Sequence, residues 1–597
     1  MSKILGHSFH IPVMGTGYTV DTPVKVAHLG ISSVVSIVDD ILIEKMREMY
    51  CKKLSLPFKP ITEKTKDFRA ERITSYLNLV DKIVKEKFEN LKESIQDKSK
   101  ELEEYLDLLP DLSEVKKEFQ EKFADNPYVK EAKEWLSKNL PLGSIDVNIM
   151  TKVDKDNYYK GEKLPTEYND AHAALRGFAM SNLESSMVLS AGMNPRLYSY
   201  LEQFEDFYPD ATGYIKKKIV LKVSDYRSAL IQGKFLAKKG IWISEYRIES
   251  GLNCGGHAFA TDGYLMGPIL QEFKEKREEL KESLHEVLVQ ALEEKGKPCP
   301  PSARELKVTA QGGVGTAEEH EFLMQHYNLD SIGWGSPFLM VPEACDVDRT
   351  TLKMLEAADE KDLSLSHASP LGVRFNNLVG NTRDADKWTR LEQNKPGSTC
   401  TKRYMVANTE FTKEPICTAS RQYQKLKLED LKQQNLPKDE YDKQVNLLLE
   451  KTCLCKGLSA ASFLVNDIDT RKDGAGVSIC PGPNLAYFTK KAKLKEMIDH
   501  IYNRTNLIER KDRPHMFIKE LTLYFDYLKE QVSEMKNPIP KQVKSLERFK
   551  NNLLSGVDYY KDLSNRFSDK FKAVKTQVEK DLEKLEGDIK NILISSK

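Results

Sequence analysis

Residues 306–319 have the sequence LKVTAQGGVGTAEE, and this stretch sets out the unit from which the fold is built. Its first half is apolar and β-branched, which favours a strand. The glycines at 312, 313 and 315 predict a tight turn. Thr316 to Glu319 then has the spacing of a helix N-cap with a capping box. The stretch therefore predicts a strand, a glycine turn and a helix in direct succession.

The same succession recurs along the central part of the chain, from Ile145 to about Leu365. Helical stretches separate most of the predicted strands, and one of them opens at Ser224. The strands that we predict are residues 145–150, 186–190, 218–223, 240–244, 306–310 and 331–336. Strands that alternate with helices pair in parallel through crossover helices. An open doubly wound sheet and a closed barrel both satisfy this pattern.

Two successive strands are followed by glycine-bearing loops, which contain Gly312 and Gly313 in one case and Gly335 and Ser336 in the other. Glycine lets the backbone approach a ligand closely, and free N–H groups at a helix N-terminus attract anions. Adjacent late strands carry phosphate-binding loops in many (β/α)8 barrels. Ordinary turns that need glycine for a positive φ would look similar, but two such loops in succession favour phosphate binding.

A histidine follows two glycines after another predicted strand, in Gly255-Gly256-His257. Imidazole accepts a proton near neutral pH, so general base is its natural catalytic role. An isolated loop histidine is more often structural. Its place between a strand end and two glycines nevertheless favours His257 as the catalytic candidate.

The order of these segments resembles the nitronate monooxygenase (2-nitropropane dioxygenase-like) group of FMN-binding TIM barrels, which includes FMN-dependent enoyl-ACP reductases. The motifs that carry the resemblance are residues 11–17 (IPVMGTG), 21–27 (DTPVKVA), 30–33 (GISS), 146–149 (DVNI), 253–257 (NCGGH), 310–314 (AQGGV) and 334–338 (WGSPF). Each motif is short, but their shared order is specific.

The resemblance implies an α/β fold, a (β/α)8 TIM barrel made of residues 1–58 and 141–370, that binds FMN. It implies that the cofactor-binding residues are Met14, Gly15, Thr16, Asn148, Lys222, Gly255, Gly256, Gly312, Gly313, Gly335 and Ser336. His257 would then remove a proton from a carbon-acid substrate while FMN accepts electrons. The Glu-Ala of the family is replaced by Asn253-Cys254, so the substrate does not carry over.

Two other functions fit the same segments. One is an NAD(P)H-dependent flavin reductase that acts on an enoyl or other activated alkene, and the other is a flavin-binding or scaffold protein without catalysis. A small-molecule substrate is expected, with NAD(P)H or oxygen as the redox partner in the enzymatic cases.

Residues 371–490 contain five cysteines, and their thiolates are potential ligands for a soft metal. The candidate ligands are Cys417, Cys453, Cys455 and Cys480, for an iron–sulfur cluster ahead of zinc. No Cys-x2-Cys pair is present, and free cysteines are also well suited to simple burial. Burial is the favoured alternative.

Residues 59–140 and 491–597 are strongly charged, with apolar residues at helical spacing. They predict a helical insertion and a helical tail that form a lid, a brace or a homodimer contact. The insertion illustrates the stripe with Ile73, Tyr76, Leu77, Val80 and Ile83.

Composition narrows the class of protein further. The 597 residues include 91 Lys and Arg and 90 Asp and Glu, so the net charge is +1, which argues against nucleic-acid binding. No apolar run of about 18 residues predicts a membrane span, and residues 1–12 do not resemble a signal peptide. Nine cysteines in so long a chain suit a reducing compartment, so we expect a cytoplasmic protein.

Overall fold

The computed structural model describes residues 6–594 except 95–99, 124–129, 150–152, 160, 191, 250–255, 259–261, 536–538 and 566–571. Gly255, predicted to bind the cofactor, therefore lies outside the described residues, as do Asn253 and Cys254.

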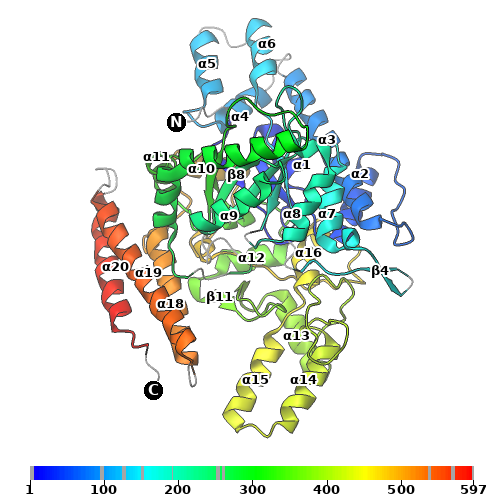
Figure 1. Ribbon diagram of the computed structural model, residues 1–597, viewed down its shortest axis with the longest axis vertical. Helices are drawn as coiled ribbons and strands as arrows, with labels where there is room; N and C mark the ends of the chain where they lie inside the picture. Colours follow the sequence, from blue (N-terminus) through cyan, green and yellow to red (C-terminus); the bar gives the residue numbers. More distant parts are fainter. Residues whose placement is uncertain are drawn as a thin grey trace.

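Eight parallel strands close into a barrel, in the order β1-β10-β9-β8-β7-β6-β3-β2 (Figure 1). Their bounds are β1 Phe9–Ile11, β2 Ser32–Ser36, β3 Ile145–Asn148, β6 Ser186–Leu189, β7 Lys218–Val223, β8 Ile243–Glu249, β9 Lys307–Gln311 and β10 Ser331–Gly333. Closure through the parallel pair of β1 and β10 excludes the open doubly wound sheet. The prediction of a (β/α)8 barrel is confirmed.

Helices and 3₁₀ turns connect the strands and cover the outside of the barrel. Their bounds are α1 Thr22–Val26, η1 Ala27–Leu29, α2 Asp40–Lys53, η3 Thr166–Tyr168, α7 Asp170–Ala179, α8 Pro195–Tyr200, η4 Leu201–Gln203, η5 Glu205–Phe207, α9 Tyr226–Ala237, α10 Met266–Glu294, α11 Ala317–His326, η6 Ser336–Met340 and α12 Arg349–Ala357. Thr316 caps α11 as predicted, because its hydroxyl accepts the N–H of Glu319 at 3.2 Å.

The interior of the barrel is unusually polar. Val34, Val188 and Val220 form one small apolar cluster of their own, separate from the main core outside the strands. Towards the amino ends of the strands, Arg247 donates to Glu245 at 2.8 Å. The interior of such barrels is usually filled by branched apolar side chains. In this protein, charged side chains that pair with each other occupy part of that space.

The helical insertion has two parts. Helix α3 (Phe68–Ser94) packs between α2 and α7, and its apolar stripe belongs to the main core. Helices α4 (Lys100–Leu108), α5 (Glu114–Phe123) and α6 (Lys130–Asn139) have a small core of their own, to which α3 adds Phe88 and Leu91. They stand at the top of the molecule in Figure 1. A short hairpin, β4 (Tyr158–Tyr159) with β5 (Glu162–Lys163), projects from the loop after β3.

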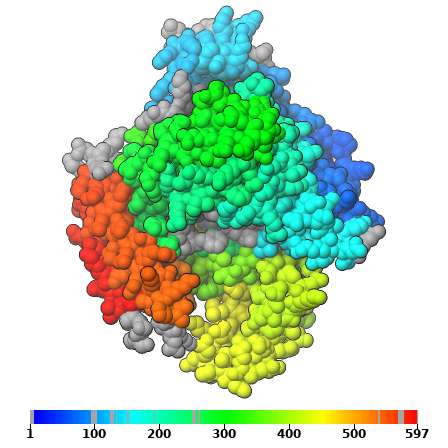
Figure 2. All heavy atoms as spheres, viewed as in Figure 1, coloured from blue at the N-terminus to red at the C-terminus, as the bar shows by residue number. Residues whose placement is uncertain are grey.

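The second half of the chain returns to the opposite end of the barrel, at the carboxyl ends of the strands (Figures 1 and 2). Its elements at this end are η7 Glu360–Asp362, β11 Leu363–Ser366, β12 Phe375–Leu378, α13 Thr382–Glu392, α14 Arg421–Gln433, α15 Lys438–Glu450, α16 Leu454–Val465 and η8 Pro483–Tyr487. Helix α17 (Leu494–Ile501) instead contacts α4 and α11. The antiparallel pair β11–β12 and helix α16 share the main core with the barrel. We call β11–β12, residues 400–406, α16 and residues 479–488 the cover.

The tail is an assembly of three long helices, α18 (Met516–Glu534), α19 (Pro540–Ser564) and α20 (Lys572–Asn591). They lie along one side of the barrel, orange to red in Figure 2. Tyr560 of α19 packs in parallel on Phe517 of α18, with ring centroids 4.7 Å apart, and Tyr559 bonds Tyr327 of the barrel region. The tail therefore braces the barrel through α18 and α19. Among the described residues, no helix combines the length and apolar character needed to cross a membrane.

Candidate active site at the carboxyl ends of the barrel strands

A cavity opens where the barrel strands end, and every one of the eight strands contributes to its wall. The contributing residues are Met14 after β1, Val38 after β2, Asn148 in β3, Ser190 after β6, Lys222 in β7, Glu249 in β8, Gln311 in β9 and Ser336 after β10. Enzymes built on this barrel use side chains from several strand ends at this face. The cavity is therefore the candidate active site.

Three neighbouring strands build a charged corner in the cavity wall. Lys222 Nζ lies 3.0 Å from Glu249 Oε2, and Gln311 Nε2 donates to Glu249 Oε1 at 2.8 Å. Both oxygens of the carboxylate are therefore held by the side chains on either side of it. A fixed lysine and carboxylate at the edge of a cavity offer a donor and an acceptor to a polar ligand.

His257 lines the same cavity, half-buried, and is held by the cover. Its Nε2 lies 2.6 Å from the hydroxyl of Ser369, which is fully buried. Because the Ser369 oxygen already accepts the N–H of Leu371 at 3.2 Å, its own hydrogen is available for Nε2. The ring also meets Phe375 edge-to-face, with centroids 5.2 Å apart. These contacts fix the plane of the imidazole.

The remaining wall is mostly apolar, and much of it comes from the cover. Its apolar residues are Val13, Met14, Val38, Val153, Leu339, Leu371, Phe375, Met405, Leu454, Leu458 and Ile479. A mainly apolar cavity with a few convergent polar groups is the usual form of a site for a small molecule or a cofactor. The barrel alone leaves this cavity open, because the residues from 371 to 480 supply one side of it.

The loop after β1 approaches the cavity closely. Gly15 has φ +50°, and a Cβ there would lie 2.8 Å from the ring of Tyr18. Thr16 follows it, and its hydroxyl oxygen is buried without a hydrogen-bond partner among the described residues. A buried hydroxyl of this kind normally has a partner, so Thr16 points to a ligand in the cavity.

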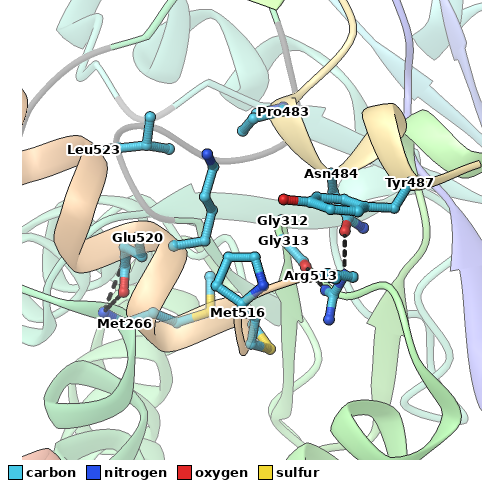
Figure 3. A pocket seen from close by; sticks show the side chains of 12 residues that line it. Met266, Gly312, Gly313, Pro483, Asn484, Tyr487, Arg513, Met516, Glu520 and Leu523 are labelled. Atoms are coloured by element: carbon cyan, nitrogen blue, oxygen red, sulfur yellow. Dashed lines mark hydrogen bonds between the residues drawn. The ribbon is translucent and has the colours of Figure 1, made fainter. Parts of the chain in front are cut away.

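Gly312 and Gly313 line a second, smaller cavity instead of the one that contains His257 (Figure 3). Both have positive φ angles, +111° and +82°. Arg513 donates to the carbonyl of Gly313 at 3.0 Å and to Asn484 Oδ1 at 2.8 Å. The glycine loop is thus covered by side chains from the second half of the chain.

Glu319 neutralises Arg513 in this second site. Its two oxygens accept from the guanidinium at 2.7 and 2.8 Å. Burial alone would raise the pKa of Glu319, but the charges of Arg513 and His515 bring it below its usual value. Lys519, on the same wall, pairs with Glu360 at 2.7 Å. Both cations of the second cavity therefore already have carboxylate partners.

A larger polar hollow adjoins the candidate active site, since Val153 and Tyr404 line both. Buried ion pairs form its inner wall: Asp40 accepts from Arg72 at 2.7 Å and lies 2.9 Å from Arg69. The ammonium group of Lys402 donates to Asp39 at 2.6 Å. These contacts fasten residues 402–404 of the cover to the start of α2.

The predicted metal site is not supported by the structure. Among the described residues, no group of three or more histidine, cysteine or acidic side chains could hold a metal ion. Cys480 lies beside the backbone of Gly15 and Gly256 in the cavity wall, where burial raises the pKa of its thiol to about 11. The Cys480 thiol is therefore neutral. Cys417 lies elsewhere, in a separate cluster with Val406 and Ala419.

The structure thus brings Met14, Gly15, Thr16, Asn148, Lys222, Gly256, His257 and Ser336 together in one cavity. Gly312 and Gly313 follow Gln311 in the chain and line the second cavity instead. Gly335 lies directly before η6 and has a negative φ of −94°, which does not require glycine. Glu249 and Gln311 were not predicted, because the predicted strands end too early: at residue 244 instead of Glu249 for β8, and at residue 310 instead of Gln311 for β9. The alternation of Glu245, Arg247 and Glu249 with buried Tyr246 and Ile248 is the signal that locates it.

The chain has distant similarity to two solved structures. No protein-family model and no curated protein matches the chain. FabK from Thermotoga maritima is 10% identical, over 66% of this chain and 83% of that chain, with a TM-score of 0.30. The enoyl reductase domain of MlnA from the macrolactin biosynthesis cluster of Bacillus amyloliquefaciens is 15% identical, over 72% and 86%, with a TM-score of 0.30.

Proposed function

We propose that the chain is a flavin-dependent oxidoreductase that binds FMN in the strand-end cavity. The observation that carries the proposal is the convergence of all eight strand ends on one largely apolar cavity with the imidazole of His257 in its wall. A flat aromatic ring system suits apolar walls, and its polar edge needs a few fixed donors and acceptors. The buried hydroxyl of Thr16 and the polar corner at Glu249 provide them.

The residues that would hold FMN divide into two groups. Met14, Gly15, Thr16, Asn148 and Lys222 would surround the ring system, since they line the cavity together with His257. Ser336 and Gly335, at the end of β10, would lie towards the phosphate. Gly312 and Gly313, at the end of β9, line the second cavity and would meet only a phosphate that extends beyond Gln311. When bound, FMN supplies a ring that takes up or gives up two electrons.

His257 is the group proposed to move a proton at the substrate carbon. Ser369 and Phe375 hold the imidazole ring, so the proton is taken up or delivered at a fixed place. Lys222 and Gln311 hold the Glu249 carboxylate, which can orient a polar group of the substrate. The cover excludes water from one side, which strengthens these polar interactions. In a reaction like that of a nitronate monooxygenase, His257 is the base that removes the proton from a carbon acid.

The same groups can work in the reverse sense, which gives the second candidate. A held imidazole can also deliver a proton to the carbon of an activated alkene, as an NAD(P)H-dependent reductase requires. The polar hollow beside the cavity, lined by Lys155 and Arg69, offers room for the charged part of a pyridine nucleotide or of a substrate.

The first test is an absorbance spectrum of the purified protein, taken before and after addition of FMN. The proposal expects flavin bands that stay with the protein through gel filtration. A colourless protein that takes up no FMN would instead support the scaffold function. Anaerobic mixing with NADPH or with a nitronate then separates the two enzymes, because the substrate that bleaches the flavin rapidly identifies the direction.

A variant tests the role of His257. His257→Gln should lower the rate of flavin reduction by the substrate about 10²- to 10⁴-fold, the usual contribution of general acid–base catalysis, while FMN stays bound. His285→Gln, on α10 outside the barrel, is the matched control and should leave the rate unchanged. An unchanged rate in His257→Gln would assign proton transfer to another group.

A further inference from the structure

Two cysteine thiols pack together at the edge of the cover, where its residues 400–406 begin. Cys400 packs against the buried cluster that Cys417 forms with Val406 and Ala419. Both are free thiols in this structure. Cys400 is partly exposed to solvent, whereas Cys417 is buried. One of the two sulfurs is therefore accessible to a reagent, and the other lies directly behind it.

The backbone holds the two thiols in register. Ser398 donates to the carbonyl of Ala419 and accepts the N–H of Arg421, both at 3.0 Å. Asn408 and Ile416 exchange two backbone hydrogen bonds, at 3.1 and 2.8 Å. These bridges close the loop on both sides of the cysteine pair, so the contact between the thiols is a fixed feature of the loop.

The charges around the pair favour a thiolate at Cys400. The hydrogen bond from Cys417 is the main cause that lowers the pKa of Cys400 to about 7, and the charges of Arg403 and Lys456 add to it. Lys456 is buried, and its ammonium group donates to two neutral oxygens, Thr399 Oγ1 and the carbonyl of Lys472. Its positive charge acts on Cys400 as well as on Asp473.

The second thiol has the opposite character. The hydrogen bond to Cys400, followed by burial, raises the pKa of Cys417 well above its usual value. Cys417 thus keeps its proton while it lies against the Cys400 sulfur. A partly exposed thiolate backed by a buried thiol has the arrangement of an attacking and a resolving cysteine.

We propose that Cys400 and Cys417 form a reversible disulfide, in which Cys400 attacks a low-molecular-weight disulfide and Cys417 resolves the product. In the first step the Cys400 sulfur bonds to one sulfur of glutathione disulfide, whose S–S bond breaks and releases one glutathione thiolate. In the second, the Cys417 sulfur bonds to Cys400 and expels the second glutathione. The two cysteines lose two protons and two electrons, which the two glutathione molecules carry away.

The disulfide would act on the wall of the candidate active site. The loop between the two cysteines includes Tyr404 and Met405, which line the cavity, and Lys402, which is fastened to Asp39. Oxidation would close this loop covalently. The inference needs no flavin, so it stands or falls independently of the proposed function.

The test uses the full-length protein treated with oxidised glutathione and then with an excess of a reducing dithiol. We expect two of the nine thiols to be lost and then recovered. Trypsin cleaves at Lys402 and Lys413, between the two cysteines, so the bridge should appear as a linked pair of peptides that contain Cys400 and Cys417.

Variants separate the first step, attack by Cys400 on glutathione disulfide, from the second, displacement of glutathione by Cys417. Cys417→Ser should accumulate glutathione on Cys400 without a bridge, and Cys299→Ser, which removes an exposed cysteine elsewhere, should form the bridge as the wild type does. The wild-type result alone decides the case if a variant does not fold. A bridge to Cys453 or Cys455, a mixed disulfide that is never resolved, or iron and sulfide that copurify with these thiols would overturn the proposal.

Discussion

Cys400 illustrates how much a single residue depends on its surroundings. An ordinary cysteine is largely protonated at neutral pH, with a pKa of about 8.5. Cys417, Arg403 and Lys456 bring the pKa of Cys400 to about 7. The thiolate of Cys400 should therefore appear at a lower pH than that of an ordinary thiol, because its neighbours stabilise the charged form.

This difference predicts the pH dependence of alkylation. The rate of iodoacetamide labelling at Cys400, followed by peptide mass spectrometry, should rise with an inflection near pH 7. Exposed Cys299 in the same sample serves as the internal control for the intrinsic pH dependence of the reagent. Cys417→Ser should move the inflection of Cys400 upward if the hydrogen bond is the main cause. An inflection near pH 8.5 in the wild type would contradict the assignment.

At the level of residues, the sequence located half of the barrel side of the cavity, whereas from the cover side it named Cys455 and Cys480 alone, and those as metal ligands. Met14, Asn148 and His257 stand at strand ends, and strand ends of a barrel converge whatever lies between them in the chain. Phe375 and Leu458 come from outside the repeated pattern. Their position depends on long-range packing, for which local sequence gives no signal.

At the level of elements, the loop after β1 and helix α16 are in backbone contact. A Cβ on Gly17 would lie 2.8 Å from the carbonyl oxygen of Leu458 and 2.7 Å from the hydroxyl oxygen of Ser462. The Ser462 hydroxyl also donates to the carbonyl of Gly17 at 2.7 Å. Helix α16 is therefore seated directly on the loop that carries the predicted cofactor residues.

Gly17→Ala should accordingly destabilise the protein by about 1–3 kcal/mol, the usual cost of forcing extra volume into a packed contact. The free energy of unfolding in urea measures this, and FMN uptake should weaken in parallel because α16 lines the cavity. Gly192→Ala is the matched control, since a Cβ there would meet no atom within 4 Å. Equal stability of the two variants would show that α16 can shift without cost.

Element boundaries show where prediction from sequence succeeds. Strand β7 is found at its predicted residues, 218–223, because four of its six residues (Ile219, Val220, Leu221 and Val223) are apolar, and three of these are β-branched. Strand β8 begins three residues later than predicted and continues to Glu249. Its glutamates and Arg247 face the polar interior of the barrel, where an apolar side chain is the general expectation.

At the level of the whole molecule, the barrel and the cover share one hydrophobic core, whereas most of α4–α6 packs in a smaller core of its own. A ligand in the cavity should therefore stabilise the barrel and the cover together. At a concentration 100 times its dissociation constant, a ligand adds about 2.7 kcal/mol to the folded state.

Hydrogen exchange can test whether a ligand stabilises the barrel and the cover together but not helices α4–α6. Added FMN should slow exchange in peptides from the mouth of the barrel and from residues 454–480, and leave residues 100–123 unchanged. Peptides of the tail, such as residues 572–591, are a second internal reference far from the cavity wall. Protection confined to the barrel would mean that the cover does not take part in the site.

The cover also imposes an order of events on synthesis at the ribosome. The last barrel strand ends at Gly333, and the last residue of the cavity wall is Cys480. At about 5–20 residues per second, translation of the intervening segment takes on the order of 10 s. During that interval the nascent chain can present a barrel whose mouth is still open. A molecule enclosed in the finished protein can enter at this stage, before the wall that confines it has been made.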